Sequence, residues 1–113
     1  MNLKEILVGL EGLKVRGNLE IDINKVKNNS EKVEPNDLFV AIKGFDFNGH
    51  EHIEEAVKKG AIAILAEEDE VSKDLLKKIP EYVTIILYKN TRYALAIAAC
   101  NFYENRAKKM KLI

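Results

Sequence analysis

Three nearly continuous apolar segments constrain the fold of this chain most strongly. Residues 38–42, 61–66 and 83–87 have the length of strands, but they lack the alternation of a strand that has one face in water. Such segments are typical of strands in a sheet that helices cover on both faces. Between them, residues 51–59 and 70–78 have helical periodicity. This order predicts a single α/β domain, with a mainly parallel or mixed sheet, flanking helices and right-handed crossovers.

The N-terminal part of the chain carries two further patterns. Apolar side chains share one helical face between residues 3 and 13, and Asn2 precedes them as a suitable N-cap, so we expect an amphipathic helix. Apolar and polar residues alternate over residues 19–23, which predicts a strand with one buried face.

The C-terminal part predicts a long helix and then a connector. Residues 92–104 are rich in apolar side chains and follow Thr91, so we expect a deeply packed helix capped by this threonine. Residues 108–113 alternate like the start of a strand. We therefore expect one domain over residues 1–107, followed by a connector into a further domain.

Charge and cysteine content exclude several classes of partner. The chain of 113 residues has 18 Lys and Arg against 18 Asp and Glu, so it lacks the basic field on which most nucleic-acid and membrane-surface proteins depend. The longest apolar run, Ala94–Cys100, is far shorter than the roughly 20 residues of a membrane helix. The single cysteine, Cys100, allows no internal disulfide, and we expect it to be buried and unreactive. These features indicate a cytoplasmic protein with neither nucleic acid nor membrane as partner.

No catalytic or metal-binding group emerges from the sequence. His50 and His52 lie two positions apart, so on a helix they would point about 200° away from each other, and we expect simple surface or loop residues. Lys43 and Gly44 reverse the Gly-Lys order of an ATP-binding P-loop, and no Ser or Thr follows. We therefore expect no catalytic residue, no metal ligand and no cofactor on this chain.

Two loops have the composition of a ligand-binding edge. Asn28, Asn29 and Ser30 offer uncharged donors and acceptors, which suit the edge of a neutral base such as uracil, although ordinary turns use the same residues. Residues 43–50 combine a cation, two glycines and the aromatic rings of Phe45 and Phe47. Such a loop can stack a base and approach a phosphate, but the two rings can equally pack on the core.

Four ordered blocks resemble the N-terminal domain of the Mur ligases, the ATP-dependent enzymes that add amino acids to the peptidoglycan precursor. The blocks are 29–31, where the family has Asp-Ser-Arg, 35–44 with its Pro-containing turn and Leu-Phe-Val-Ala, 48–50 with Gly-His, and Gly60-Ala61. The sequence Phe-Tyr-Glu-Asn at 102–105 favours the MurE type, which adds the third amino acid, over the MurF type.

The resemblance implies a role in holding the UDP end of UDP-N-acetylmuramoyl-L-alanyl-D-glutamate. It places the uridine contacts at Asn28 and Ser30 in the first loop and at Phe45, Asp46 and Phe47 in the second. ATP and Mg²⁺ would bind to the middle domain of the same enzyme, and a C-terminal domain would select diaminopimelate or lysine. The fragment alone would then be a docking domain without catalytic groups.

One departure from the family pattern bears on this role. Asn29 and Glu31 replace the usual Asp and Arg. If that Arg mainly pairs with its Asp, the loss of both leaves no unpaired buried charge, and the loop keeps its shape. If the Arg contacts phosphate, Glu31 repels the ligand and affinity is weak. A non-enzymatic α/β interaction module, in which both loops are plain turns, is the alternative from another class.

Overall fold

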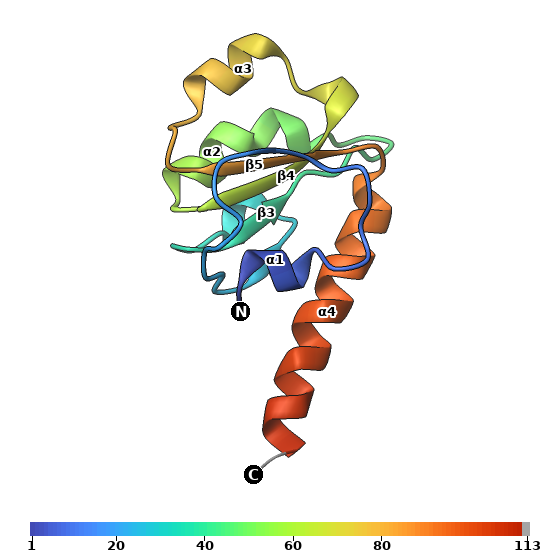
Figure 1. Ribbon diagram of the computed structural model, residues 1–113. Coiled ribbons are helices and arrows are strands. Elements are labelled where there is room, and N and C mark those ends of the chain that lie inside the picture. Colours follow the sequence, from blue (N-terminus) through green and yellow to red (C-terminus); the bar gives the residue numbers. More distant parts are fainter. Residues whose placement is uncertain (112–113) are drawn as a thin grey trace.

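The protein folds around one five-stranded mixed sheet (Figure 1). The computed structural model describes residues 1–111, with side chains to residue 105. The strands are β1 (Lys14–Arg16), β2 (Val26–Lys27), β3 (Leu38–Val40), β4 (Ala63–Glu67) and β5 (Thr84–Tyr88), in the order β1-β5-β4-β3-β2. Strands β2 to β5 pair in parallel and β1 pairs with β5 antiparallel. The predicted α/β fold with its mainly parallel sheet is confirmed.

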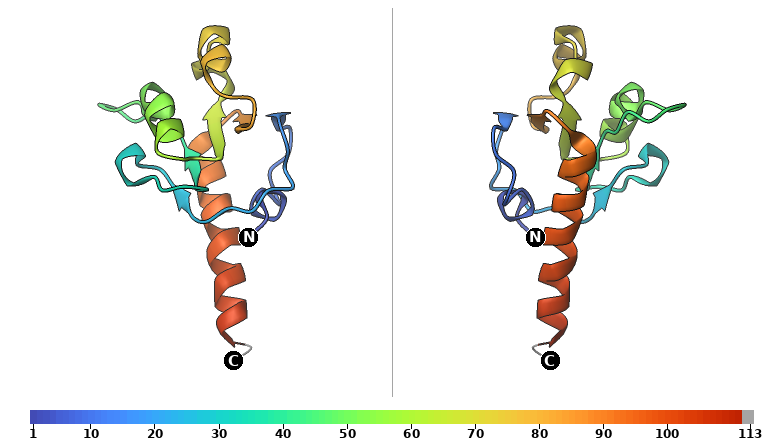
Figure 2. Two further views of the ribbon diagram at one scale, coloured as in Figure 1. Left: turned by 90° about the vertical axis from the view of Figure 1, so that its left-hand side faces the viewer. Right: turned by 90° about the vertical axis from the view of Figure 1, so that its right-hand side faces the viewer.

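Helices cover both faces of the sheet (Figure 2). They are α1 (Leu3–Ile6), α2 (Ile53–Lys58), α3 (Lys73–Lys78) and α4 (Thr91–Lys111), and short 3-10 turns form η1 (Ser30–Lys32), η2 (Gly49–His52) and η3 (Glu68–Glu70). Side chains of α1 and α4 pack with Leu38 and Val40 on one face of the sheet. Those of α2 and α3 pack with Phe39 and Ala41 on the other. Successive residues of β3 therefore serve opposite layers, which explains the unbroken apolar run.

The N-terminal region differs from the prediction. Asn2 caps α1 as expected, since its side chain accepts a hydrogen bond from the Lys4 N–H over 2.9 Å, but the helix ends at Ile6. Gly9 and Gly12 have φ values of +100° and +77°, which a helix does not allow. The strand predicted over 19–23 is wrong. Its apolar side chains do pack on the core, but its backbone runs beside the N-terminus with a single bridge between Asn2 and Asp22.

Helix α4 also differs from the prediction. Asn90, rather than Thr91, caps it, because the Asn90 side chain accepts a hydrogen bond from the Tyr93 N–H over 3.1 Å. The helix is not deeply packed all round: Ala94, Ala98 and Phe102 are buried at helical spacing, while the opposite face is exposed. Cys100 lies on that exposed face, contrary to prediction.

The same helix crosses the predicted end of the domain. It is helical up to Lys111, so the strand predicted over 108–113 is wrong as far as residue 111, and residues 112–113 lie outside the described part. The boundary after residue 107 therefore falls within a helix and stays a prediction.

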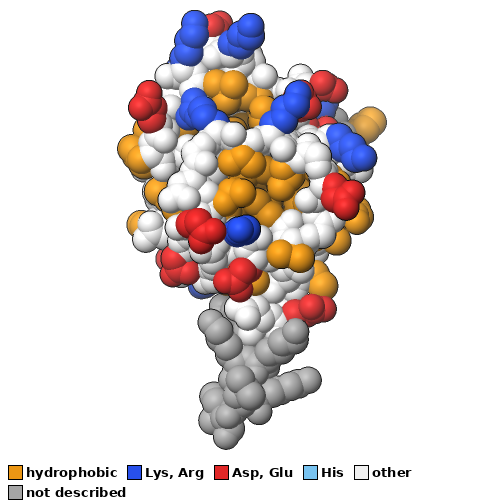
Figure 3. Space-filling view, viewed as in Figure 1, with side chains coloured by type: hydrophobic (Ala, Val, Ile, Leu, Met, Phe, Trp, Pro, Cys, Tyr) orange, Lys and Arg blue, Asp and Glu red, His pale blue; other side chains and the backbone are white. Residues whose placement is uncertain are grey.

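Acidic and basic side chains both occur on the face seen in Figure 3, where they surround an apolar area at the centre. This mixed surface accords with the zero net charge of the chain. No helix within residues 1–111 is long and apolar enough to cross a membrane.

Candidate functional site

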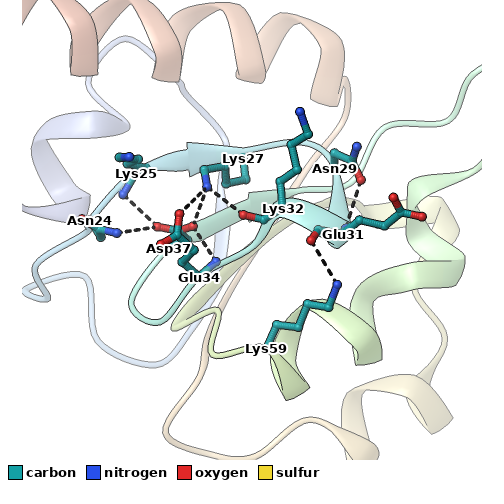
Figure 4. A network of polar contacts seen from close by, with 9 residues as sticks. All are labelled: Asn24, Lys25, Lys27, Asn29, Glu31, Lys32, Glu34, Asp37 and Lys59. Atoms are coloured by element: carbon teal, nitrogen blue, oxygen red, sulfur yellow. Dashed lines mark hydrogen bonds and ion pairs between the residues drawn. The ribbon is translucent and has the colours of Figure 1, made fainter.

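The turn between β2 and β3 is built around the carboxylate of Asp37 (Figure 4). This buried side chain accepts hydrogen bonds from the Lys25 N–H over 3.0 Å, the Asn24 amide over 3.2 Å and the Glu34 N–H over 2.8 Å. The Lys27 ammonium lies 3.3 Å from the same carboxylate. The network holds the end of β2 beside the start of β3, and so fixes where the first candidate loop begins.

The first candidate loop leaves β2 at Asn28 and closes into η1. The Asn29 side chain accepts a hydrogen bond from the Glu31 N–H over 3.0 Å, and Ser30 is buried at 3% exposure. The carbonyl oxygen of Glu31 accepts a hydrogen bond from Lys59, while its carboxylate points away from both Asn29 and Lys59 (Figure 4). The turn therefore forms with Asn and Glu at these positions, and neither residue leaves a buried unpaired charge.

The second candidate loop is a narrow excursion after β3. The Gly49 N–H donates to the Ile42 carbonyl over 2.8 Å, and a Cβ atom at Gly49 would lie 2.9 Å from the Ile42 nitrogen. At the tip Phe45 is fully exposed, and Asp46 is exposed as well. Phe47 is 55% exposed, and the alternative that both phenylalanines pack on the core is wrong.

Phe47 instead stacks on His52, with ring centroids 5.0 Å apart and an angle of 10° between the rings. The phenylalanine ring is thus held by one neighbour and keeps much of its surface accessible. Such a ring is available for stacking on a planar ligand.

A pocket of about 350 Å³ joins the two loops. It lies at the carboxyl ends of β2 and β3, where parallel α/β sheets commonly bind ligands. Its lining residues come from both loops and from the start of α4: Asn28, Ile42, Gly44, Phe47, Arg92 and Leu95. The structure therefore brings Asn28 and Phe47 together. Ser30, Phe45 and Asp46 do not line this pocket.

Arg92 is the residue that sequence reasoning missed. It stands in the first turn of α4, and its guanidinium donates to the Lys43 carbonyl over 3.5 Å. The available signal was a cation one residue after Thr91, directly behind the last strand of the sheet. An arginine beside an amide and an aromatic ring supplies the groups needed to bind a planar polar ring that carries an anion.

His50 is buried at 5% exposure, so it is not the surface or loop residue we expected. Its Nδ1 atom lies 2.7 Å from the Asn48 side-chain oxygen, and its Nε2 atom accepts a hydrogen bond from the Glu67 N–H over 3.0 Å. Burial lowers the pKa of His50, although the nearby Glu70 and Glu67 oppose this effect. The ring ties the second loop to the end of β4.

The described part of the chain contains no group of three or more His, Cys, Asp and Glu side chains that could hold a metal ion. Cys100 hydrogen-bonds to Glu104, and this contact raises the pKa of the thiol, so the nucleophilic thiolate is disfavoured.

Known proteins similar to this chain all belong to one family of ligases among those compared here. A family model described as "Mur ligase family, catalytic domain" matches residues 22–103. Three curated UDP-N-acetylmuramoyl-L-alanyl-D-glutamate–2,6-diaminopimelate ligases are similar over the whole chain: those of Clostridium tetani (42% identical), Clostridioides difficile (41%) and Bacteroides fragilis (40%). The chain spans only 22% of the length of each.

Solved structures agree with this grouping. The MurF ligase of Thermotoga maritima in complex with ADP is 36% identical, with a TM-score of 0.50 over 66% of this chain and 15% of that one. A MurF structure from Acinetobacter baumannii is 25% identical, with a TM-score of 0.56 over 75% of this chain and 17% of that one. The family model matches residues 22–103, and the similar ligase sequences align with all 113 residues of this chain. The chain therefore belongs to the Mur ligase family.

Proposed function

We propose that this chain is the domain of a MurE-type ligase that holds the UDP moiety of UDP-N-acetylmuramoyl-L-alanyl-D-glutamate. The observation that carries the proposal is the pocket shared by the two loops, with Asn28 on one side and Phe47 on the other. Both residues belong to the set that the resemblance implies. The names of the relatives, which include this same UDP-linked substrate, support the choice of ligand.

Each wall of the pocket has a chemical role in this proposal. The Asn28 amide offers a donor and an acceptor to the uracil edge, and the accessible face of Phe47 stacks on the base. Arg92 neutralises the diphosphate with charge-assisted hydrogen bonds. Ser30, Phe45 and Asp46 lie outside the pocket lining, so they would meet only those parts of the ligand that extend beyond it.

The remaining steps of the reaction would take place outside this chain. ATP and Mg²⁺ would bind to the middle domain, because this sequence has no glycine-rich phosphate loop. The D-glutamate carboxylate would be activated as an acyl phosphate, and the amine of diaminopimelate or lysine would then form the amide. The docking domain would contribute by holding the substrate in position.

Two alternatives are weaker. The two solved structures compared above are MurF ligases, but they cover 66% and 75% of this chain, whereas the MurE-type relatives named above cover all of it at 40% to 42% identity. The middle and C-terminal domains of the whole enzyme would distinguish the two types. A non-enzymatic interaction module would bind no nucleotide in the pocket.

Titration of the ¹⁵N-labelled chain with UDP tests the proposal. We expect amide shifts at Asn28, at residues 44–47 and at Arg92, and we expect the F47A variant to weaken binding. The matched control is Tyr82→Ala, because Tyr82 is an exposed aromatic residue (71%) that lines a different cavity. Shifts confined to that other cavity, or none at millimolar UDP, would contradict the proposal.

A further inference from the structure

We propose that His50 is a positioning residue for the nucleotide pocket: its neutral ring holds the second loop to the end of β4, where the Glu67 side chain also holds the start of α4. The inference rests on the proposed function, because its consequence is measured as nucleotide affinity. His50 does not line the pocket, so it acts through the residues that do.

The directions of its hydrogen bonds determine which ring nitrogen of His50 carries the proton. The Asn48 amide nitrogen donates to Glu70 over 2.9 Å, so the Asn48 oxygen faces His50, where it also accepts from the His50 backbone N–H over 3.0 Å. This oxygen can only accept, so the Nδ1 atom of His50 carries a proton. The Nε2 atom accepts from the Glu67 N–H and therefore carries none.

The end of β4, at Glu67, also holds the first turn of α4. The Thr91 hydroxyl donates to the Glu67 carboxylate over 2.9 Å, and Thr91 is buried. Arg92 follows directly in the chain. One residue, Glu67, thus holds the second loop through its backbone and the start of α4 through its side chain. Glu67 therefore helps to position both walls of the pocket, the one that carries Phe47 and the one that carries Arg92.

Protonation of the ring would break the connection. A proton on Nε2 would face the Glu67 N–H, so two donors would oppose each other. The charged groups around the ring are Glu70 from η3, Glu67 from β4 and Lys43 from the loop. The two carboxylates favour the imidazolium and Lys43 opposes it, but burial is the largest effect, and it keeps the neutral form as pH falls below the ordinary pKa.

The sign of the pH effect separates positioning from direct attraction. If the imidazolium merely lay near a bound diphosphate, its charge would raise affinity as pH falls. If the neutral ring positions the pocket, affinity falls as the ring becomes protonated. UDP-N-acetylglucosamine is a suitable probe, because its esterified diphosphate does not titrate in this range. We expect its affinity for the full chain to fall about tenfold as the ring becomes protonated below pH 7.5, because one hydrogen bond is lost.

Two variants assign the effect to one histidine. Glutamine at position 50 keeps an acceptor for the Glu67 N–H but does not titrate, so H50Q should retain affinity within a few-fold at pH 7.5 and lose the pH dependence. The control is H52Q: His52 stacks on Phe47, so affinity falls, but the pH dependence should remain. Ring ¹⁵N shifts of the wild-type chain give a readout that needs no variant, with Nδ1 protonated and Nε2 unprotonated at pH 7.5.

The outcomes are distinct. Absence of binding by the wild-type chain at every pH would overturn the proposed function, and this inference with it. Binding whose pH dependence survives in H50Q, affinity that rises towards pH 5, or a ring with its proton on Nε2 would overturn the inference alone. An H50Q variant that fails to fold leaves the ring shifts and the sign of the wild-type pH dependence to decide.

Discussion

A Cβ atom at Gly60 would lie 2.7 Å from the Cα atom of Pro35, so the turns that precede β4 and β3 are in backbone contact. The contact is reinforced by Asn36, whose N–H donates to the Gly60 carbonyl over 2.9 Å. Pro35 and Gly60 both lie in the blocks that resemble the Mur ligases. Part of that resemblance therefore reflects how two parallel strands are aligned rather than how a ligand is bound.

Replacing Gly60 with alanine should strongly destabilise the fold. The residue has a φ of +107°, and the new methyl group would collide with backbone rather than with a movable side chain. We expect a loss of about 3 kcal/mol in the free energy of unfolding, measured by urea denaturation. Gly12→Ala is the matched control, since Gly12 has a φ of +77° but no atom within 4 Å of the added Cβ. It should cost only about 1 kcal/mol, and equal losses in the two variants would contradict the role of the Pro35 contact.

The Asp37→Asn variant tests the network between β2 and β3. The amide would turn a donor towards groups that donate to the carboxylate, and Lys27 would lose its buried partner. We expect a loss of about 3 kcal/mol in unfolding free energy. Glu34→Gln removes only an exposed partner of Lys27 at 3.5 Å, so it should change stability by no more than about 0.5 kcal/mol. Similar values for both variants would count against a central role for Asp37.

The sequence predicted those elements whose pattern matched their packing. Strands β3, β4 and β5 appeared as apolar runs because both faces are covered, and α2 and α3 appeared through helical periodicity. The segment 19–23 misled because its alternating side chains pack on the core while its backbone bonds mostly to the N-terminus. Alternating apolar and polar residues indicate that one side of a segment is buried, but they do not indicate which segment its backbone pairs with.

The candidate site was predictable only in part, for a similar reason. Asn28 and Phe47 stood out because the resemblance places both among the uridine contacts, although ordinary turns also use asparagine. Arg92 did not, because a cation in the first turn of a helix has an ordinary appearance in sequence. Its place in the pocket follows from the way α4 packs against the sheet beside the second loop.

Arg92→Gln should separate the diphosphate contact from the base contact. Because the variant removes a charge-assisted hydrogen bond, we expect UDP to bind about tenfold more weakly. Uridine, which lacks phosphate, should bind equally to both proteins. Isothermal titration at low salt measures the two affinities, and Lys89→Gln is the control, because Lys89 is exposed and lines another cavity. An equal loss for uridine and UDP would show that Arg92 does not meet the phosphates.

The stability of the chain should depend on His50 in mildly acidic solution. Burial lowers the pKa of His50 in the folded state, so below the ordinary value of about 6.5 the unfolded chain binds more protons. The unfolding free energy should therefore fall as pH drops from about 6.5 towards the folded pKa, and the fall should be smaller in H50Q. Urea denaturation at pH 7.5 and 5.5 measures the difference between the two proteins. A wild-type chain that is no more sensitive to pH than the variant would contradict the buried neutral ring.

Intermolecular NOEs between UDP and the labelled chain test the central claim most directly. With uracil and ribose in the pocket, the base protons should show NOEs to the Phe47 ring and the Leu95 methyl groups, both of which line it. NOEs from the base to Val57 and Tyr82 in the cavity between α2 and the start of β5, with none to Phe47, would contradict the account.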